Sequence, residues 1–65
     1  MYGKIIKELR IEKNLTQKAL AQALNTSQKT ISKYEKEQLD LGTETVIAVC
    51  RFFDVSADYL LGLKD

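Results

Sequence analysis

Apolar residues recur at helical spacing along most of the chain and are interrupted by short polar breaks. In residues 2–13 the apolar positions lie three or four apart, and residues 43–53 carry a second such row that ends at Phe53. A short third row covers residues 57–61, with Ser56 placed to cap it. The pattern predicts helices over 2–13, over 42 or 43 to 53, and over 57–61.

Between these rows, residues 16–36 predict two short helices joined by a tight turn. Thr16 and Ser27 precede the two helices and have side-chain oxygens that can cap free backbone N–H groups. Asn25 stands where the first helix would end in a left-handed residue, a conformation that Asn tolerates well. The turn is too short for an antiparallel pair, so the helices should cross steeply, with the small Ala21 where they approach. A helix-turn-helix is therefore predicted; the alternative is an ordinary helical hairpin in a small bundle.

The second helix of this motif has two chemically different faces. Ile31, Tyr34 and Glu35 share one face. The opposite face is polar, carries no acid, and consists of Gln28, Lys29, Ser32, Lys33 and Lys36.

The predicted core follows from the same apolar rows. It comprises Ile6, Leu9, Leu15, Leu20, Ala21, Leu24, Ile31, Tyr34, Val46, Val49, Cys50, Phe53, Val55, Tyr59 and Leu60. Each large side chain that is fully buried contributes roughly 1.5–3 kcal/mol before entropy is subtracted. Leu39 and Leu41 fall in the loop 37–42 and should pack either inward or against a partner.

The composition fits a single all-α domain over residues 1–65. Proline is absent and glycine occurs only three times, which disfavours long irregular segments. No apolar run is long enough to span a membrane and no signal-peptide pattern is seen, so a cytoplasmic protein is expected. The single cysteine, Cys50, lies in an apolar helical row and is expected to be a structural thiol.

The net charge of +1 conceals a strong asymmetry along the chain. Residues 13–36 carry +4, residues 37–65 carry −4, and residues 1–12 carry +1. Such a dipolar molecule can orient towards a polyanion in spite of its low net charge.

Catalysis is not expected. The chain has no histidine, its lone cysteine has no base nearby in sequence, and it lacks a glycine-rich phosphate loop. No cluster has metal-ligand spacing, so neither a metal nor a cofactor is expected.

The polar face of the second motif helix suits the DNA major groove, which admits an α-helix. Gln28 can present its amide to adenine, Lys29 can donate to guanine, and Lys33 can reach a base or a phosphate. Ser27 and Ser32 are short enough to lie against the groove. Phosphates would meet the free N–H groups near Gln17 and the side chains of Lys18 and Lys36. The alternative is a solvated helix face without a partner.

The chain resembles the lambda-repressor-like family, which includes Cro, phage-repressor and Xre-type DNA-binding domains. The resemblance rests on Thr16, Gln17, Leu20, Ala21, Ser27, Ile31, Ser32 and Glu35, and on the ending V-S-x-D-Y-L-L-G over residues 55–62. It departs at Asn25, where the family usually has glycine, and at Thr26, where it usually has a branched aliphatic residue. The loop 37–42 lacks the family's basic residues and proline, which weakens the expectation of loop–phosphate contacts.

The resemblance implies a compact five-helix fold with the helix-turn-helix at helices two and three. It also implies a transcriptional regulator specific for double-stranded DNA, with repression favoured, and a Gln17 side chain that braces Gln28. Arg10 and Glu35 both fall on inward faces, and the resemblance implies a buried ion pair between them.

The leucines of the loop and of the C-terminal residues can serve either of two functions. One helix reads only a few base pairs, so a twofold dimer on an inverted repeat is expected, weak without DNA. Its surface would use Leu61 and Leu63 with the loop leucines Leu39 and Leu41, although Leu61 and Leu63 can equally close the domain's own core. The alternative function is a protein-interaction or antitoxin-like module that uses the same four leucines.

Overall fold

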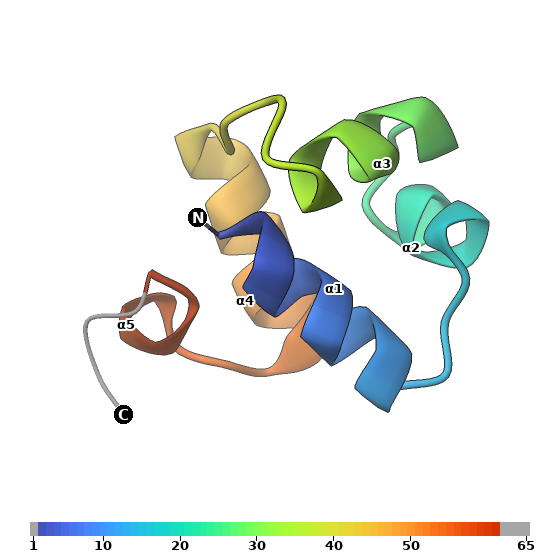
Figure 1. Ribbon diagram of the computed structural model, residues 1–65. Helices are drawn as coiled ribbons and strands as arrows, with labels where there is room; N and C mark the ends of the chain where they lie inside the picture. The colour runs from blue at the N-terminus through green and yellow to red at the C-terminus, as the bar shows by residue number, and fades with distance from the viewer. Residues whose placement is uncertain (1, 62–65) are drawn as a thin grey trace.

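The five predicted helices are present in the computed structural model, which describes residues 2–61 (Figure 1). They are α1 (Gly3–Glu12), α2 (Gln17–Ala23), α3 (Gln28–Glu35), α4 (Thr43–Phe53) and α5 (Ala57–Leu60), and no strand occurs in this part of the chain. The observed bounds differ from the predicted ones by one residue at some ends, which is common because helix termini fray. The all-α prediction is confirmed.

The three predicted serine and threonine caps are all formed. Each side-chain oxygen accepts from the backbone N–H three residues on, with Thr16 paired to Ala19, Ser27 to Thr30 and Ser56 to Tyr59. These bonds satisfy donors that the first helical turn leaves without a partner. The starts of α2, α3 and α5 are therefore fixed by local sequence.

Four helices end at a residue in the left-handed conformation. Asn14, Asn25, Glu37 and Asp54 have φ values of 58°, 58°, 61° and 56°. After each, the next residue donates its N–H to a carbonyl five positions back, in the pairs Leu15–Arg10, Thr26–Ala21, Gln38–Lys33 and Val55–Cys50. This is the Schellman pattern, and none of the four positions is a glycine. The left-handed prediction for Asn25 is confirmed.

The core is built from members of the predicted set. The buried apolar side chains in residues 2–61 are Ile6, Leu9, Leu20, Ala21, Ile31, Val49, Phe53 and Leu60. Partly buried residues pack against them, including Leu15, Leu24, Tyr34, Val46, Cys50 and Val55 from the prediction and Leu41 from the loop. The fold therefore has one core, shared by all five helices.

Tyr59 is the exception, because the prediction that it is a core residue is wrong. Its side chain is 43% exposed, whereas the adjacent Leu60 is fully buried. Helix α5 is a single turn, and neighbouring residues on a helix point about 100° apart. Only one of the two can face the core, and Leu60 does.

Helix α1 lies unusually close to the end of α3. A Cβ built on Gly3 would lie 1.8 Å from the carbonyl oxygen of Tyr34, so no other residue fits there without a shift of one helix. One residue further on, the backbone N–H of Lys4 donates to Glu37 Oε1 at 3.2 Å. The start of α1 is thus held against the segment that follows α3.

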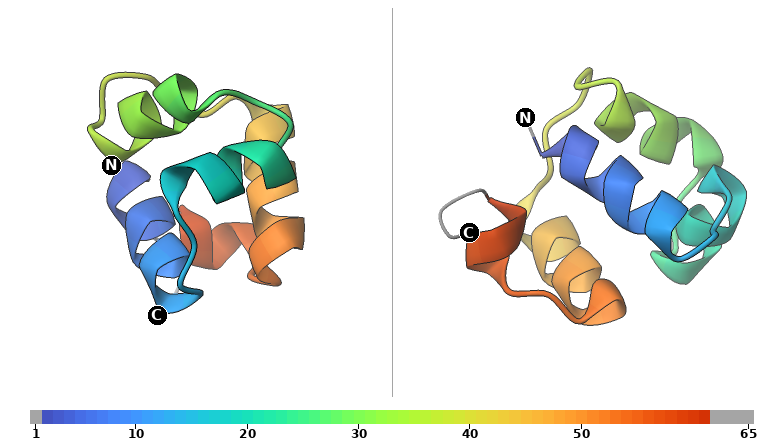
Figure 2. Two further views of the ribbon diagram at one scale, coloured as in Figure 1. Left: turned by 90° about the vertical axis from the view of Figure 1, so that its right-hand side faces the viewer. Right: turned by 60° about the horizontal axis from the view of Figure 1, so that its bottom comes forward.

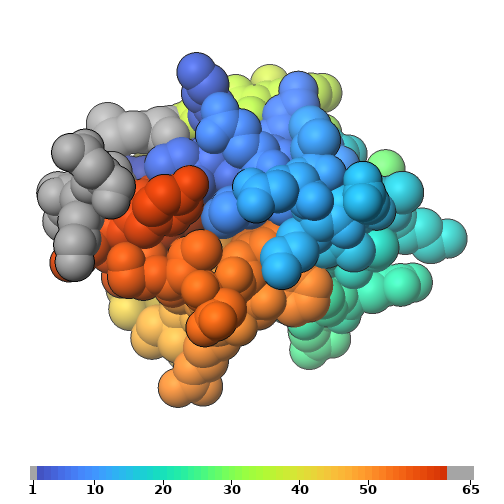
Figure 3. All heavy atoms as spheres, turned by 90° about the horizontal axis from the view of Figure 1, so that it is seen from below, coloured from blue at the N-terminus to red at the C-terminus, as the bar shows by residue number. Residues whose placement is uncertain are grey.

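Helix α3 and helix α5 occupy opposite sides of the molecule (Figure 2). Seen from the side away from α3, the atoms of α1, α4 and α5 pack side by side (Figure 3). One face of α3 is consequently left uncovered by the rest of the described chain. Leu63, a predicted dimer residue, lies outside the described residues.

Candidate nucleic-acid interface

The polar face of α3 is turned to solvent, as predicted. Gln28, Lys29, Lys33 and Lys36 are exposed, and Ser32 is half-buried. On the other face Ile31 is fully buried, and Tyr34 and Glu35 are largely covered. At 1.5 Å per residue this eight-residue helix is about 12 Å long, which suits insertion into a major groove.

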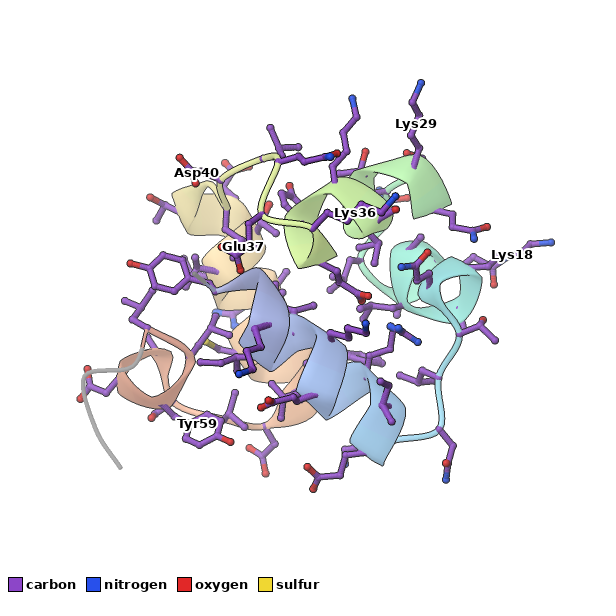
Figure 4. The ribbon with its side chains drawn as sticks, viewed as in Figure 1. Lys18, Lys29, Lys36, Glu37, Asp40 and Tyr59 are labelled. Carbon is purple, nitrogen blue, oxygen red and sulfur yellow. The ribbon has the colours of Figure 1, made fainter. Side chains whose placement is uncertain are left out.

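The start of α2 supplies a second group of donors beside α3. Thr16 caps only Ala19, so the N–H groups of Gln17 and Lys18 have no partner within the helix. Lys18 points out from the start of α2, and Lys29 points away from the start of α3 (Figure 4). Free N–H groups at a helix start attract anions.

Ser27 has a structural role that limits what it can offer. Its Oγ accepts from the N–H of Thr30 at 3.2 Å and lies 2.9 Å from Thr30 Oγ1. The residue remains exposed, so the hydroxyl can still lie against a groove wall.

The predicted ion pair between Arg10 and Glu35 is confirmed. Arg10 Nε donates to Glu35 Oε2 at 2.7 Å, and Nη2 donates to Oε1 at 3.1 Å. The third guanidinium nitrogen of Arg10, Nη1, donates to the carbonyl oxygen of Leu15 at 2.8 Å. The two side chains are only 13% and 3% exposed, so the pair is shielded from water.

Gln17 joins this pair and does not brace Gln28, which corrects the expectation from the family resemblance. Its Nε2 donates to Glu35 Oε1 at 3.1 Å. A buried carboxylate is the stronger acceptor, because hydrogen bonds to an ionised group exceed those between neutral amides. Gln28 is left exposed, with its amide directed by no neighbour in residues 2–61.

Burial of Glu35 changes the charge that this region presents. Glu35 is the only acid between residues 13 and 36, and its charge is compensated by Arg10. The five lysines of the segment, Lys13, Lys18, Lys29, Lys33 and Lys36, are all exposed. The surface of the motif is thus more basic than the sequence sum suggests.

The loop after α3 has the opposite character. Glu37 and Asp40 are exposed just beyond the end of α3, and Leu39 is 45% exposed (Figure 4). Leu41 instead packs against the core, so only Leu39 of the two loop leucines faces solvent. The positive surface ends at Lys36.

Gly3 and Glu37 are structurally important residues that carry no sequence signal for their roles. Gly3 looks like an ordinary residue near a helix start, and Glu37 like part of a polar loop. Their partners lie more than thirty positions away, which only an observed or co-varying contact could have revealed.

Within residues 2–61, no three His, Cys, Asp or Glu side chains gather as a metal site. None of the helices in that range is long and apolar enough to cross a membrane.

Known proteins share both the sequence and the fold. A family model described as "Helix-turn-helix" matches residues 6–60. The HTH-type transcriptional regulator ImmR of Bacillus subtilis is 40% identical over 60 residues, covering 92% of this chain and 47% of its own length. The antitoxin PezA of Streptococcus pneumoniae is 36% identical over 62 residues, covering 95% and 39%. The chain thus spans less than half of these two relatives.

A solved structure is similar over nearly its whole length. The P22 c2 repressor protein, in complex with synthetic operator 9T, superposes with a TM-score of 0.85 and 27% sequence identity. The match covers 92% of this chain and 91% of that one. The predicted five-helix lambda-repressor-like fold is confirmed.

Proposed function

Because the chain belongs to the Cro/C1-type helix-turn-helix family, we propose that residues 1–65 form one DNA-binding domain of a cytoplasmic transcriptional regulator, with repression favoured. It binds double-stranded operator DNA by inserting α3 into the major groove. The observation that carries the proposal is the exposed face of α3, which has three lysines and one amide but no acid. The free N–H groups at the start of α2 lie beside it.

Base contacts come from the first half of α3. Gln28 is exposed and can pair its amide with adenine N6 and N7, and Lys29 can donate to guanine O6 and N7. Lys33, one turn on, reaches either a base or a phosphate, and the neighbouring Ser32 is half-buried. Selection of bound duplexes from a random library tests this assignment by giving the preferred bases.

Phosphate contacts come from both motif helices. Gln17 supplies a free backbone N–H, Lys18 adds a cation at the start of α2, and Lys36 adds another at the end of α3. Ser27 contributes only through its exposed position at the α3 cap. These contacts should fix the position of α3 without reading sequence.

Two lysine substitutions should separate base reading from phosphate contact. Lys29→Ala should weaken binding and also change the preferred bases, because it removes a base-edge donor. Lys18→Ala should weaken binding to all sequences and lower the slope of log K against log salt by about one unit. Duplex titrations at several salt concentrations measure both effects.

Arg51→Ala is the control, since Arg51 is an exposed cation in the last turn of α4, outside the helix-turn-helix. It should leave the salt slope and the base preference unchanged. If Lys18→Ala and Lys29→Ala also behave like wild type on duplex DNA, the proposed face is wrong.

We further propose that the domain binds as a twofold dimer on an inverted repeat, with a dimer that is weak without DNA. The two copies of α3 should lie about 34 Å apart, one turn of B-DNA. Leu61 at the end of α5 is half-buried, the adjacent Tyr59 is exposed, and Leu39 is exposed on the loop. These residues support a small contact, whereas Leu41 belongs to the domain's own core.

Sedimentation with a symmetric duplex should show two chains per duplex. Leu61→Lys should reduce that stoichiometry at a given concentration while the monomer keeps its fold, which circular dichroism checks. Saturation at one chain per duplex would exclude the dimer and leave DNA binding itself intact.

A protein-interaction or antitoxin-like role is the second candidate. It is favoured by the exposed Leu39, which with Tyr2, Tyr34 and Asp40 borders a hollow of about 350 Å³. A module with this role alone should bind heterologous duplex DNA weakly even at low salt. The basic surface of α2 and α3 should give measurable binding under those conditions.

A further inference from the structure

We propose that the hollow between the start of α1, the end of α3 and the loop 37–41 docks a basic peptide segment of a partner protein, anchored by one large apolar side chain. The inference rests on the interaction role proposed as the second candidate, and it names the chemistry of the partner. It is independent of DNA binding, because none of Lys18, Gln28 and Lys29 lines the hollow.

The hollow forms where two segments far apart in the sequence are held together. Gly3 is buried against the backbone of Tyr34, and the backbone N–H of Lys4 donates to Glu37 Oε1 at 3.2 Å. Tyr2 lines the hollow at the start of α1, and Tyr34 lines it at the end of α3. The walls are therefore fixed by the fold itself, so an occupant does not have to open them.

The size and the lining of the hollow suit a single apolar anchor. Its volume of about 350 Å³ is near the lower end for pockets that hold small ligands, so it has room for one or two side chains but not for a helix. Leu39, which is 45% exposed, and Leu41 line it beside the two tyrosines. An aliphatic or aromatic side chain placed there would remove apolar surface of both molecules from water.

The charge of the hollow favours a cation beside that anchor. Two of its lining residues, Glu37 and Asp40, are acidic and none is basic. Both are exposed beyond the end of α3 (Figure 4). Asp40 makes no hydrogen bond or ion pair with any other residue in the range 2–61. An arginine or lysine next to the anchor can therefore pair with Asp40, whereas an acidic segment would be repelled.

A second copy of the chain and a DNA strand both fit this hollow less well than a basic peptide does. A twofold interface uses the same patch on both subunits, so two copies docked through the hollow would bring their Glu37 and Asp40 side chains together. Like charges across an interface oppose association. The phosphates of DNA meet the same repulsion, which leaves a basic peptide as the occupant that matches both size and charge.

Two synthetic peptides that differ only in charge test the inference. One is acetyl-Gly-Arg-Phe-Arg-Gly-amide, and in the other both arginines are replaced by glutamate. In an NMR titration of the isotope-labelled protein, the basic peptide should shift, in a saturable way, the amide signals of Gly3, Leu39, Asp40 and Leu41. We expect a dissociation constant on the order of 0.1–1 mM for so short a ligand. The acidic peptide should bind at least about 5-fold more weakly.

Two pairs of variants separate this site from general effects of charge and apolar surface. Asp40→Asn should weaken binding of the basic peptide about 2–5-fold, the range of an exposed ion pair. Glu12→Gln makes the same change of charge at the far end of α1 and should have no effect. Leu39→Ala should weaken binding about 3-fold or more, whereas Ile47→Ala, at a residue 46% exposed on α4, should not. None of the four residues is buried, so the variants should keep the fold.

Several results would overturn the inference. They are no saturable shift at about 10 mM basic peptide, shifts confined to other residues, equal binding of the two peptides, and equal effects of a variant and its control. Preferred binding of the acidic peptide at the same amides would keep an interaction role for the hollow and exclude a basic partner. Shifts of these amides with protein concentration alone would assign the hollow to a second copy. In each case the proposal of DNA binding would stand, because duplex titrations test it separately.

Discussion

Removing either partner of the Arg10–Glu35 ion pair should lower the free energy of unfolding by about 3–5 kcal/mol. Glu35→Leu would leave the Arg10 guanidinium almost buried and without its carboxylate, and Arg10→Met would do the same to Glu35. An uncompensated buried charge accounts for most of that loss. A domain of 65 residues has a total stability of roughly 3–10 kcal/mol, so either variant should be close to unfolded.

Replacing both partners together should be far less damaging. Arg10→Met with Glu35→Leu removes the buried charges and leaves side chains of similar size, which costs little when they pack well. Urea unfolding of the two single variants and the double variant measures the comparison. If each single substitution lowered the free energy of unfolding by less than about 1 kcal/mol, the ion pair would not be what holds α1 to α3.

Gly3→Ala should destabilise the protein by about 1–3 kcal/mol, although alanine is the better helix former by about 1 kcal/mol. The added Cβ would lie 1.8 Å from the Tyr34 carbonyl oxygen and 2.8 Å from its carbonyl carbon. Both are backbone atoms, so α1 must move away from α3. The shift would also lengthen the bond from the Lys4 N–H to Glu37.

Gly42→Ala is the control for the substitution itself. Gly42 precedes α4 with a φ of −75°, and a Cβ there meets nothing within 4 Å. Gly42→Ala should lower the free energy of unfolding by less than about 1 kcal/mol, which is the difference between glycine and alanine as an N-cap. Thermal unfolding of the two variants distinguishes them, and a Gly3→Ala protein as stable as wild type would show that α1 and α3 are not in close contact.

Much of the fold follows from the sequence because its signals are local. The caps at Thr16, Ser27 and Ser56 each need only a backbone N–H three residues away. The apolar rows predict the core well because helical spacing decides which side chains share a face. The ion pair between Arg10 and Glu35 follows from their inward positions together with the family resemblance.

The failures occur where distant segments compete for one side chain or one space. Tyr59 faces solvent because a single-turn helix buries only Leu60. Gln17 bonds Glu35 and not Gln28 because the carboxylate is the stronger acceptor within reach. The fit of Gly3 against Tyr34 depends on how two helices approach, which no local pattern encodes. Which residues contact DNA stays a prediction.

The left-handed residues that end four helices also affect the disordered ensemble from which the protein folds. A non-glycine residue in this conformation has backbone strain that a glycine would avoid. The strain is roughly 1 kcal/mol for Glu37 and less for Asn14, Asn25 and Asp54, because Asn and Asp tolerate the conformation better. A glycine would in turn give the unfolded chain more conformations and lose about 0.5–1 kcal/mol more entropy on folding. The strain in the native state and the smaller entropy loss on folding nearly cancel. The chain therefore turns at the ends of four helices without glycine, and with little effect on the net free energy of folding.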